Sequence, residues 1–224
     1  MIRYNKMLIP ETIEEVINPS YTAILAIDLQ PDLAVPKDPN DNLYAKMLKK
    51  LRPFLDVSRK YGVQIVYTQA FNSPDPHSAA NWYMSMRVRQ QKDPRKVIRK
   101  VIPGTKGAEI IDSVRPKNGD IVITKPRNSA FFGTGLDLML RNLGIKTVVL
   151  TGCQTDGCVE STLRDSLFCL DYFTVVVSDC VASFARENHE AMMKVFRLRC
   201  DVLSSDQIIK VWGKQKAGVQ RHQT

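Results

Sequence analysis

Apolar and polar positions along the chain form two repeating kinds of segment. Short stretches such as Thr22–Ile27 are apolar almost throughout, which predicts strands buried on both faces of a parallel sheet. Other stretches, such as 43–55, carry apolar residues at helical spacing and predict helices with one buried face. The two kinds alternate along the chain, so the pattern predicts a three-layer α/β/α fold with a mainly parallel, six-stranded sheet.

The same pattern sets the expected bounds of each element. We predict strands at Thr22–Ile27, Val63–Thr68, Asp120–Thr124, Lys146–Leu150, Phe173–Val177 and Asp201–Leu203. We predict helices at 43–61, Gly107–Val114, Leu136–Leu143, Asp156–Cys169, Asn188–Leu198 and Ser205–Trp212. Thr155 and Asp156 are the candidate N-caps of the fourth helix. Pro53 should kink or divide the first helix, because proline removes a backbone donor.

The other segments are less regular. Residues 1–21 should form an irregular arm, 22–212 one domain, and 213–224 a basic, mobile tail. Within the turn-rich stretch 69–104, the apolar residues of Trp82–Met86 predict a short helix. That helix would cover a pocket, lie on the core or contact another subunit. Because of the last option, a homo-oligomer (a dimer or a tetramer) is expected.

Composition narrows the class of protein. No apolar run reaches the roughly eighteen residues of a membrane span, and the N-terminus lacks a signal-peptide core, so no membrane association is expected. The five cysteines lack paired spacing, which favours free thiols in a reducing, cytoplasmic setting. The formal charge of +9 is spread along the chain, and we interpret it as solvated surface rather than a nucleic-acid site.

Three chemically active side chains stand where predicted strands end or the next helix begins. They are Asp28, Lys125 and Cys158. The carboxyl ends of parallel strands share one edge of the sheet, where ligands bind, so these groups should meet in one crevice. If the strand order is 3-2-1-4-5-6, two strand spacings, about 10 Å, separate Lys125 from Asp28. The lysine side chain would then have to reach back across the edge.

A carboxylate, an ammonium and a thiol form a workable set for acyl transfer. Asp28 would take the thiol proton and return it to a leaving amine. Lys125 and the start of the helix would lower the pKa of Cys158, which attacks a carbonyl to give a thioester. Backbone N–H groups of the turn would stabilise the oxyanion. For Cys158 taken alone, a buried structural thiol is an equally good interpretation.

Four motifs in order carry a resemblance to a known family. They are Ala26-Ile27-Asp28-Leu29-Gln30, Pro103-Gly104-Thr105-Lys106-Gly107, Thr124-Lys125-Pro126-Arg127-Asn128-Ser129-Ala130-Phe131 and Thr151-Gly152-Cys153-Gln154-Thr155-Asp156-Gly157-Cys158-Val159. With them the chain resembles the isochorismatase-like cysteine hydrolases, closest to the N-carbamoylsarcosine, ureidoacrylate and biuret amidohydrolases. The resemblance spans roughly residues 10–205 and implies their Rossmann-like fold.

The resemblance also implies the roles of particular residues. It implies an Asp28–Lys125–Cys158 catalytic triad and a cis peptide between Cys153 and Gln154. The N–H groups of Gln154 and Cys158 would then form the oxyanion hole. The implied substrate contacts are Gln30, Asn72, Arg127, Asn128, Ser129 and Phe131.

Departures from the family pattern narrow the choice of substrate. Nicotinamidases carry an Asp-x-His metal site after the second strand, where this chain has Thr68–Ser73 without a histidine. Isochorismatases lack a cysteine nucleophile, so vinyl-ether hydrolysis is disfavoured. Pro31 stands where the family usually has asparagine, so this chain departs from the family pattern directly after Gln30. The histidines, His77, His189 and His222, lack ligand spacing, so neither a metal nor another cofactor is expected.

The leading hypothesis is a cysteine-dependent amidohydrolase that cleaves a small amide, carbamoyl or ureido compound and releases ammonia. A catalytically silent binding or scaffold protein is the alternative, and within the family a nicotinamidase-type amidase is another. Nucleic-acid binding through the basic patches ranks last. Cys153 is expected to pack in the core, and Cys169, Cys180 and Cys200 to be buried structural thiols.

Overall fold

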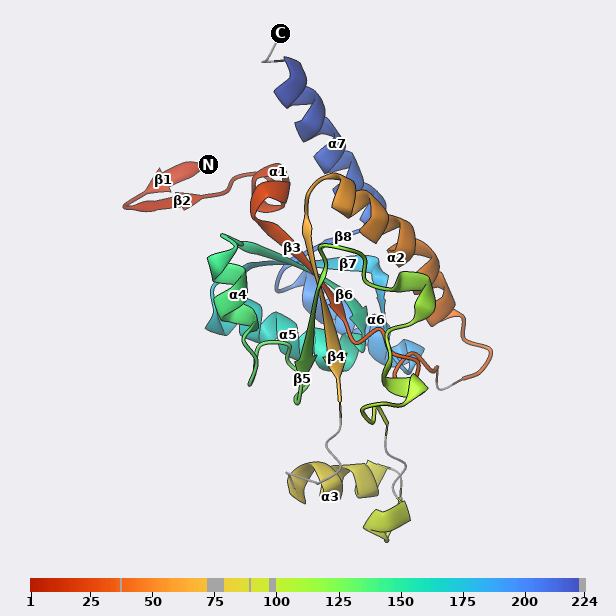
Figure 1. The fold of residues 1–224 in the computed structure, drawn as a ribbon. Coiled ribbons are helices and arrows are strands. Elements are labelled where there is room, and N and C mark those ends of the chain that lie inside the picture. The colour runs from red at the N-terminus through yellow and green to blue at the C-terminus, as the bar shows by residue number, and fades with distance from the viewer. Residues whose placement is uncertain (37, 72–78, 89, 97–99, 222–224) are drawn as a thin grey trace.

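The computed structural model describes residues 1–36, 38–71, 79–88, 90–96 and 100–221. Its centre is a six-stranded sheet in the order β5–β4–β3–β6–β7–β8, in which every neighbouring pair is parallel (Figure 1). The strands are β3 (Thr22–Ile27), β4 (Gln64–Ala70), β5 (Ile121–Lys125), β6 (Thr147–Cys153), β7 (Phe173–Ala182) and β8 (Asp201–Leu203). The predicted six-stranded α/β fold is confirmed, and the strand order, which the sequence left open, is 3-2-1-4-5-6.

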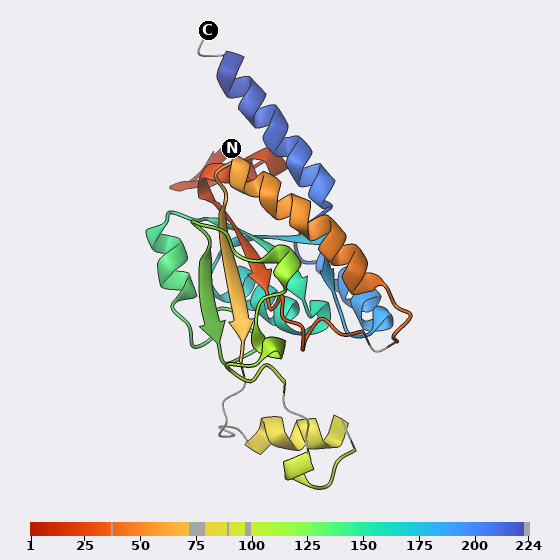
Figure 2. The ribbon, with the colours of Figure 1, turned by 45° about the vertical axis from the view of Figure 1, so that its right-hand side comes forward.

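Helices cover both faces of this sheet (Figures 1 and 2). Helices α2 (Leu43–Lys60) and α7 (Ser205–Arg221) pack on one face. Helices α4 (Leu136–Asn142), α5 (Glu160–Arg164) and α6 (Arg186–Arg197) pack on the other. Successive side chains of a strand point to opposite faces, so β3 contributes to two separate cores. In the described residues, no helix combines the length and apolarity that a bilayer crossing requires.

Helix α2 runs through Pro53 without a break, so the prediction that proline divides it is wrong. Pro53 lies on the exposed face, whereas Leu51, Phe54 and Leu55 are buried against the sheet. Burial of these three side chains on both sides of the proline outweighs the roughly 3 kcal/mol that an interior proline costs.

The predicted helix at Gly107–Val114 is also wrong in form. Two 3₁₀ turns, η3 (Lys106–Ala108) and η4 (Asp112–Val114), stand there instead. The backbone between them is tied to the loop after β3, since Ile111 N–H donates to the Leu29 carbonyl at 2.8 Å. This tertiary hydrogen bond replaces the one that a continuous helix would make. The other short elements are α1 (Ile13–Val16), η1 (Pro19–Tyr21), α3 (Ala79–Val88) and η2 (Pro94–Lys96).

Strand β7 extends five residues past its predicted end at Val177, to Ala182. The polar residues Ser178 and Asp179, which suggested a strand end, lie where the β6–β7 register shifts. The Asp179 carboxylate accepts hydrogen bonds from the N–H and hydroxyl of Ser205, at 2.8 and 2.7 Å, and so caps the start of α7. Helix α7 itself continues from the predicted end at Trp212 to Arg221.

The N-terminal arm contains a hairpin of β1 (Ile2–Tyr4) and β2 (Met7–Ile9). It projects away from the sheet at the amino-terminal end of the chain (Figure 1). Cross-strand pairing puts Ile2 opposite Ile9 and Tyr4 opposite Met7 on one face of the hairpin. All four side chains are more than two-fifths exposed, so this hairpin carries an uncovered apolar face.

Candidate active site

Asp28 follows β3 at the carboxyl edge of the sheet. Its backbone lies in the left-handed region, at φ 51°, which aspartate tolerates better than most residues. The Asp28 N–H donates to the Thr68 carbonyl at 3.1 Å, and the Thr68 hydroxyl donates to Asp28 Oδ1 at 2.7 Å. Both residues are fully buried. The end of β4 therefore fixes the orientation of the carboxylate.

Lys125 ends β5, and its side chain is fully buried. Its Nζ lies 2.7 Å from Asp28 Oδ2, so the lysine does reach across the width of β4. The same ammonium donates to the carbonyls of Arg127 and Asn128, at 2.9 and 3.0 Å. The turn after β5 folds back over its own lysine and supplies these two acceptors.

Cys158 lies in the first turn of a continuous helical segment from Thr155 to Cys169, which follows β6. Its Sγ is 3.4 Å from Lys125 Nζ, and its thiol is hydrogen-bonded to Asp28. The thiol is half-buried, in contrast to its two partners. The structure thus brings the three predicted catalytic side chains together at one point of the sheet edge.

The peptide between Cys153 and Gln154 is cis, as the resemblance implies. The N-cap of the following helix is Gln154, so Thr155 and Asp156 were wrongly predicted to cap it. The Asp156 carboxylate instead accepts from the Ser183 hydroxyl at 2.6 Å and the Asn188 amide at 2.8 Å. Gly152, at φ 101°, lets β6 approach β3 so closely that a Cβ there would lie 2.0 Å from the Ile27 carbonyl oxygen.

The charges of the three groups depend on their burial and on one another. Burial raises the pKa of Asp28, and the nearby Lys125 only partly offsets this. Burial alone would lower the pKa of Lys125, but Asp28 and Cys158 raise it above its ordinary value, so the ammonium persists. Burial and the Asp28 carboxylate raise the pKa of Cys158 to about 12. The expectation of a lowered thiol pKa is therefore wrong, because burial and Asp28 outweigh Lys125.

A thiol with a raised pKa should alkylate slowly at neutral pH. We expect the rate of iodoacetamide labelling at Cys158 to rise about tenfold per pH unit from pH 7 to pH 10, without levelling off. Peptide mass spectrometry can measure it, with the exposed Cys169 as internal reference. A rate that levels off below pH 8 would show a stabilised thiolate and contradict this electrostatic picture.

The predicted substrate contacts take varied positions. The Gln30 carboxamide is buried, donates to the carbonyls of Ala70 and Ala108 at 2.9 and 2.6 Å, and accepts from Ala70 N–H at 2.9 Å. It therefore joins the end of β4 to η3. Arg127 and Asn128 are exposed beside the triad. Asn72 lies outside the described residues.

Ser129 and Phe131 are held by the protein itself. The buried Ser129 hydroxyl accepts from the Phe131 N–H at 3.2 Å and so closes the turn. The Phe131 ring stacks on Tyr172 at 5.7 Å and belongs to the core under α4 and α5. The ring that the resemblance implies as a substrate contact therefore turns inward, where its apolar area is buried.

A cavity of about 430 Å³ opens at the carboxyl ends of β4 and β5. The residues that line it include Gln30, Gln69, Phe71, Thr105, Glu109 and Thr124. Among the residues that the structure describes, no group of three or more His, Cys, Asp and Glu side chains is placed to hold a metal ion.

The remaining cysteines differ in their burial. Cys153 is buried, as predicted, and its thiol donates to the Asp28 carbonyl at 3.2 Å. Cys180 is buried as well, but Cys200 is half-buried and Cys169 is exposed. The prediction that all three structural thiols are buried is therefore wrong for Cys169, which faces solvent at the end of its helix.

Two residues that sequence reasoning missed support this site. Thr68 orients the Asp28 carboxylate, and Tyr44 donates from its hydroxyl to the Gln154 carboxamide at 2.8 Å. A threonine in a strand and a tyrosine on an apolar helix face are both typical of ordinary core positions. The sequence pattern therefore carries no signal for either role.

Comparison with known proteins agrees with this geometry. The isochorismatase domain model matches residues 22–207, so the chain belongs to the isochorismatase family. Over 175 residues the chain is 33% identical to ureidoacrylate amidohydrolase RutB of Caulobacter segnis, covering 73% of each protein.

Two solved structures are also similar. N-carbamoylsarcosine amidase of Thermoplasma acidophilum is 29% identical, with a TM-score of 0.65 over 83% of this chain and 96% of its own. A cysteine hydrolase of Pseudomonas syringae superimposes with a TM-score of 0.75 over 89% of this chain and 95% of its own; at 19% identity it supports the fold alone. The chain is a hydrolase, and its curated relatives place it among enzymes that act on C–N bonds.

Proposed function

We propose that the chain is a cysteine-dependent amidohydrolase. Its substrate is a small amide, carbamoyl or ureido compound, from which it releases ammonia through a thioester intermediate. The observation that supports this proposal is the contact of Lys125 Nζ with both Asp28 Oδ2, at 2.7 Å, and Cys158 Sγ, at 3.4 Å. A buried acid–base group next to a thiol that solvent can reach is what nucleophilic catalysis requires.

In the first half-reaction, Cys158 Sγ attacks the substrate carbonyl carbon while its proton passes to the Asp28 carboxylate. The carbonyl π electrons move to oxygen, and the oxyanion accepts hydrogen bonds from the N–H groups of Gln154 and Cys158. When the intermediate collapses, the C–N bond breaks and its electron pair stays on nitrogen. Asp28 returns the proton to that nitrogen, and ammonia leaves.

In the second half-reaction, water attacks the thioester carbon and gives a proton to Asp28. The C–S bond breaks, and the sulfur takes back the proton to restore the thiol. Lys125 stays protonated throughout and stabilises the negative charge that moves between carboxylate, sulfur and oxygen. The raised pKa of Cys158 suits this scheme, because the thiol keeps its proton until substrate arrives.

The chemistry around the triad favours a ureido acid or a similar carbamoyl compound. The relatives are named for ureidoacrylate and N-carbamoylsarcosine, which both carry a carboxylate and a carbamoyl nitrogen. Exposed Arg127 and Asn128 stand beside the triad and suit a carboxylate and a polar amide respectively. The predicted contacts of Gln30, Asn72 and Ser129 belong to this proposal.

Release of ammonia tests the proposal and its alternatives. We expect wild-type enzyme to release ammonia from N-carbamoyl amino acids or ureido acids faster than from nicotinamide. Turnover of nicotinamide alone would favour the nicotinamidase-type alternative. No turnover of any carbamoyl compound would favour the silent binding protein. Slow alkylation of Cys158 would not favour the silent binding protein, because the raised pKa of this thiol already accounts for slow alkylation.

We further propose that the chain self-associates as a dimer or tetramer. Helix α3 exposes Tyr83, Met84 and Val88, which are 59%, 51% and 75% exposed, and the N-terminal hairpin carries a second apolar face. Light scattering should give two or four times the 25.4 kDa chain mass. A molar mass of one chain at micromolar concentration would contradict self-association. The free state of all five cysteines supports a reducing, cytoplasmic location.

A further inference from the structure

The Gln154 side chain is held by three parts of the chain. Its Oε1 accepts from the Tyr44 hydroxyl at 2.8 Å and from the Phe184 N–H at 2.6 Å. Its Nε2 donates to the Leu33 carbonyl at 2.7 Å. These partners belong to α2, to the connection between β7 and α6, and to the loop after β3. Both lone pairs of the amide oxygen are therefore used.

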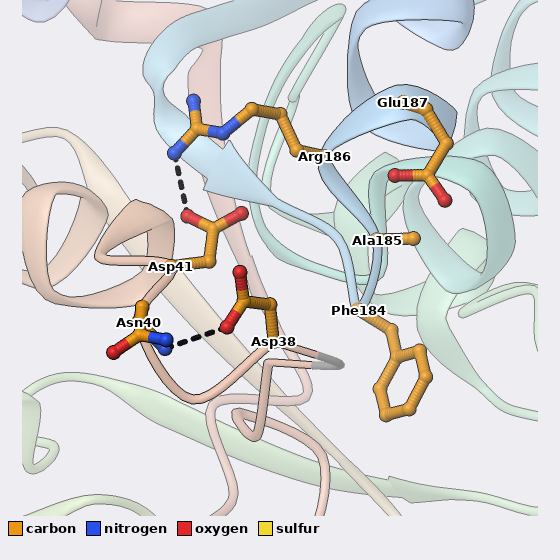
Figure 3. A pocket seen from close by; sticks show the side chains of 7 residues that line it. All are labelled: Asp38, Asn40, Asp41, Phe184, Ala185, Arg186 and Glu187. Atoms are coloured by element: carbon orange, nitrogen blue, oxygen red, sulfur yellow. Dashed lines mark hydrogen bonds and ion pairs between the residues drawn. The ribbon is translucent and has the colours of Figure 1, made fainter.

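The connection that supplies Phe184 is itself fastened on both sides. Figure 3 shows Phe184–Glu187 facing Asp38–Asp41 across a cavity of about 520 Å³. Arg186 spans the gap with an ion pair to Asp41, at 2.5 Å. On the other side Ser183 and Asn188 bind the Asp156 carboxylate. The Phe184 anchor of Gln154 is thus held by contacts of its own.

Tyr44 differs from the other two anchors because it acts through a side chain. Its ring is 4% exposed and packs in the core between α2 and the sheet. Burial raises the pKa of its hydroxyl, so the group remains a neutral donor over the working pH range. Loss of the hydroxyl alone would leave the Gln154 oxygen with one partner and the backbone otherwise unchanged.

We propose that Tyr44 is a positioning residue, which holds the Gln154 carboxamide and thereby orients the Gln154 peptide N–H toward the oxyanion. The side chain and the peptide nitrogen share one Cα, so restraint of the side chain restrains the N–H. This inference rests on the proposed function, in which that N–H is an oxyanion donor. Tyr44, in α2, would then affect catalysis without touching the substrate.

The variant Tyr44→Phe removes the hydroxyl and keeps the ring. We expect kcat for a carbamoyl substrate to fall about tenfold, because one neutral hydrogen bond is lost behind the oxyanion donor. KM should stay within about twofold, since the donor acts on charge that develops in the transition state. The rate of iodoacetamide labelling at Cys158 should not change, because alkylation forms no oxyanion.

A matched control is Tyr67→Phe. Tyr67 is equally buried, and its hydroxyl oxygen accepts from Arg59 Nη2 at 3.1 Å, in another part of the fold. The Tyr67→Phe variant should lose about as much unfolding free energy as Tyr44→Phe but keep the wild-type kcat. A double variant adds a second test: Tyr44→Phe combined with Gln154→Met should be no slower than Gln154→Met alone, if Tyr44 acts only through Gln154.

The outcomes separate this inference from the proposed function. An active wild-type enzyme and an equally active Tyr44→Phe variant would overturn the positioning role alone. An equal loss of kcat in Tyr67→Phe would also overturn it, and so would a matching loss of Cys158 labelling in Tyr44→Phe. Either result would indicate a general effect on the fold. An inactive wild-type enzyme would overturn the proposed function and this inference with it.

Discussion

Cys158→Ala is expected to lower kcat by at least about 10⁴-fold, the largest effect of any single substitution in the chain. Alanine cannot form the covalent intermediate, and neither neighbour can replace it as a nucleophile. Asp28 is held by Thr68 and Lys125, and the Lys125 ammonium keeps its proton. Steady-state ammonia release measures the effect directly.

The matched control is Cys169→Ala. Cys169 is an exposed thiol at the far end of the same helical segment, so its loss should leave kcat unchanged. Circular dichroism and thermal unfolding should show that both variants are folded. More than about 1% of wild-type turnover in Cys158→Ala would rule out a mechanism that needs the thiol as nucleophile.

Lys125→Met is expected to reduce both stability and activity. The Asp28 carboxylate would remain fully buried without its ammonium, which costs about 3–5 kcal/mol in the free energy of unfolding. The carbonyls of Arg127 and Asn128 would lose their donor as well. We expect kcat to fall by about 10³-fold or more, because the charge transferred between Asp28 and Cys158 would no longer be stabilised.

A double variant separates these two effects. Asp28→Asn with Lys125→Met removes both buried charges, so it should recover much of the lost unfolding free energy but none of the activity. Lys50→Met is the control for an exposed ion pair. Lys50 and Asp206 are both exposed, so loss of this pair should not measurably change the free energy of unfolding. A single variant Lys125→Met as stable as the wild type would contradict the buried ion pair.

The fold could be predicted well from the sequence because its strands are buried on both faces. Runs such as Thr22–Ile27 have one plausible structure, and the strand end at Asp28 follows from the change to a polar residue. The convergence of Asp28, Lys125 and Cys158 then follows from the parallel topology and from the length of the lysine side chain, which reaches across β4. Errors arose where tertiary contacts overrule local signals, as at Pro53 and in the segment 107–114.

The details of the site depend on contacts that no local pattern encodes. Whether Phe131 turns toward the site or toward Tyr172 is decided by packing. The pKa of Cys158 is set by a competition among burial, Asp28 and Lys125, and their distances are not visible in the sequence. The role of Tyr44 depends on a hydrogen bond to a residue 110 positions away.

Mass spectrometry of a trapped acyl-enzyme tests the central claim most directly. Wild-type enzyme is mixed with a carbamoyl substrate, quenched in acid within one turnover and digested. We predict that the peptide carrying Cys158 gains the mass of the substrate acyl group, and that the Cys158→Ala enzyme shows no such gain. Turnover without any adduct at Cys158, or an adduct on another residue, would contradict the claim that this sulfur is the nucleophile.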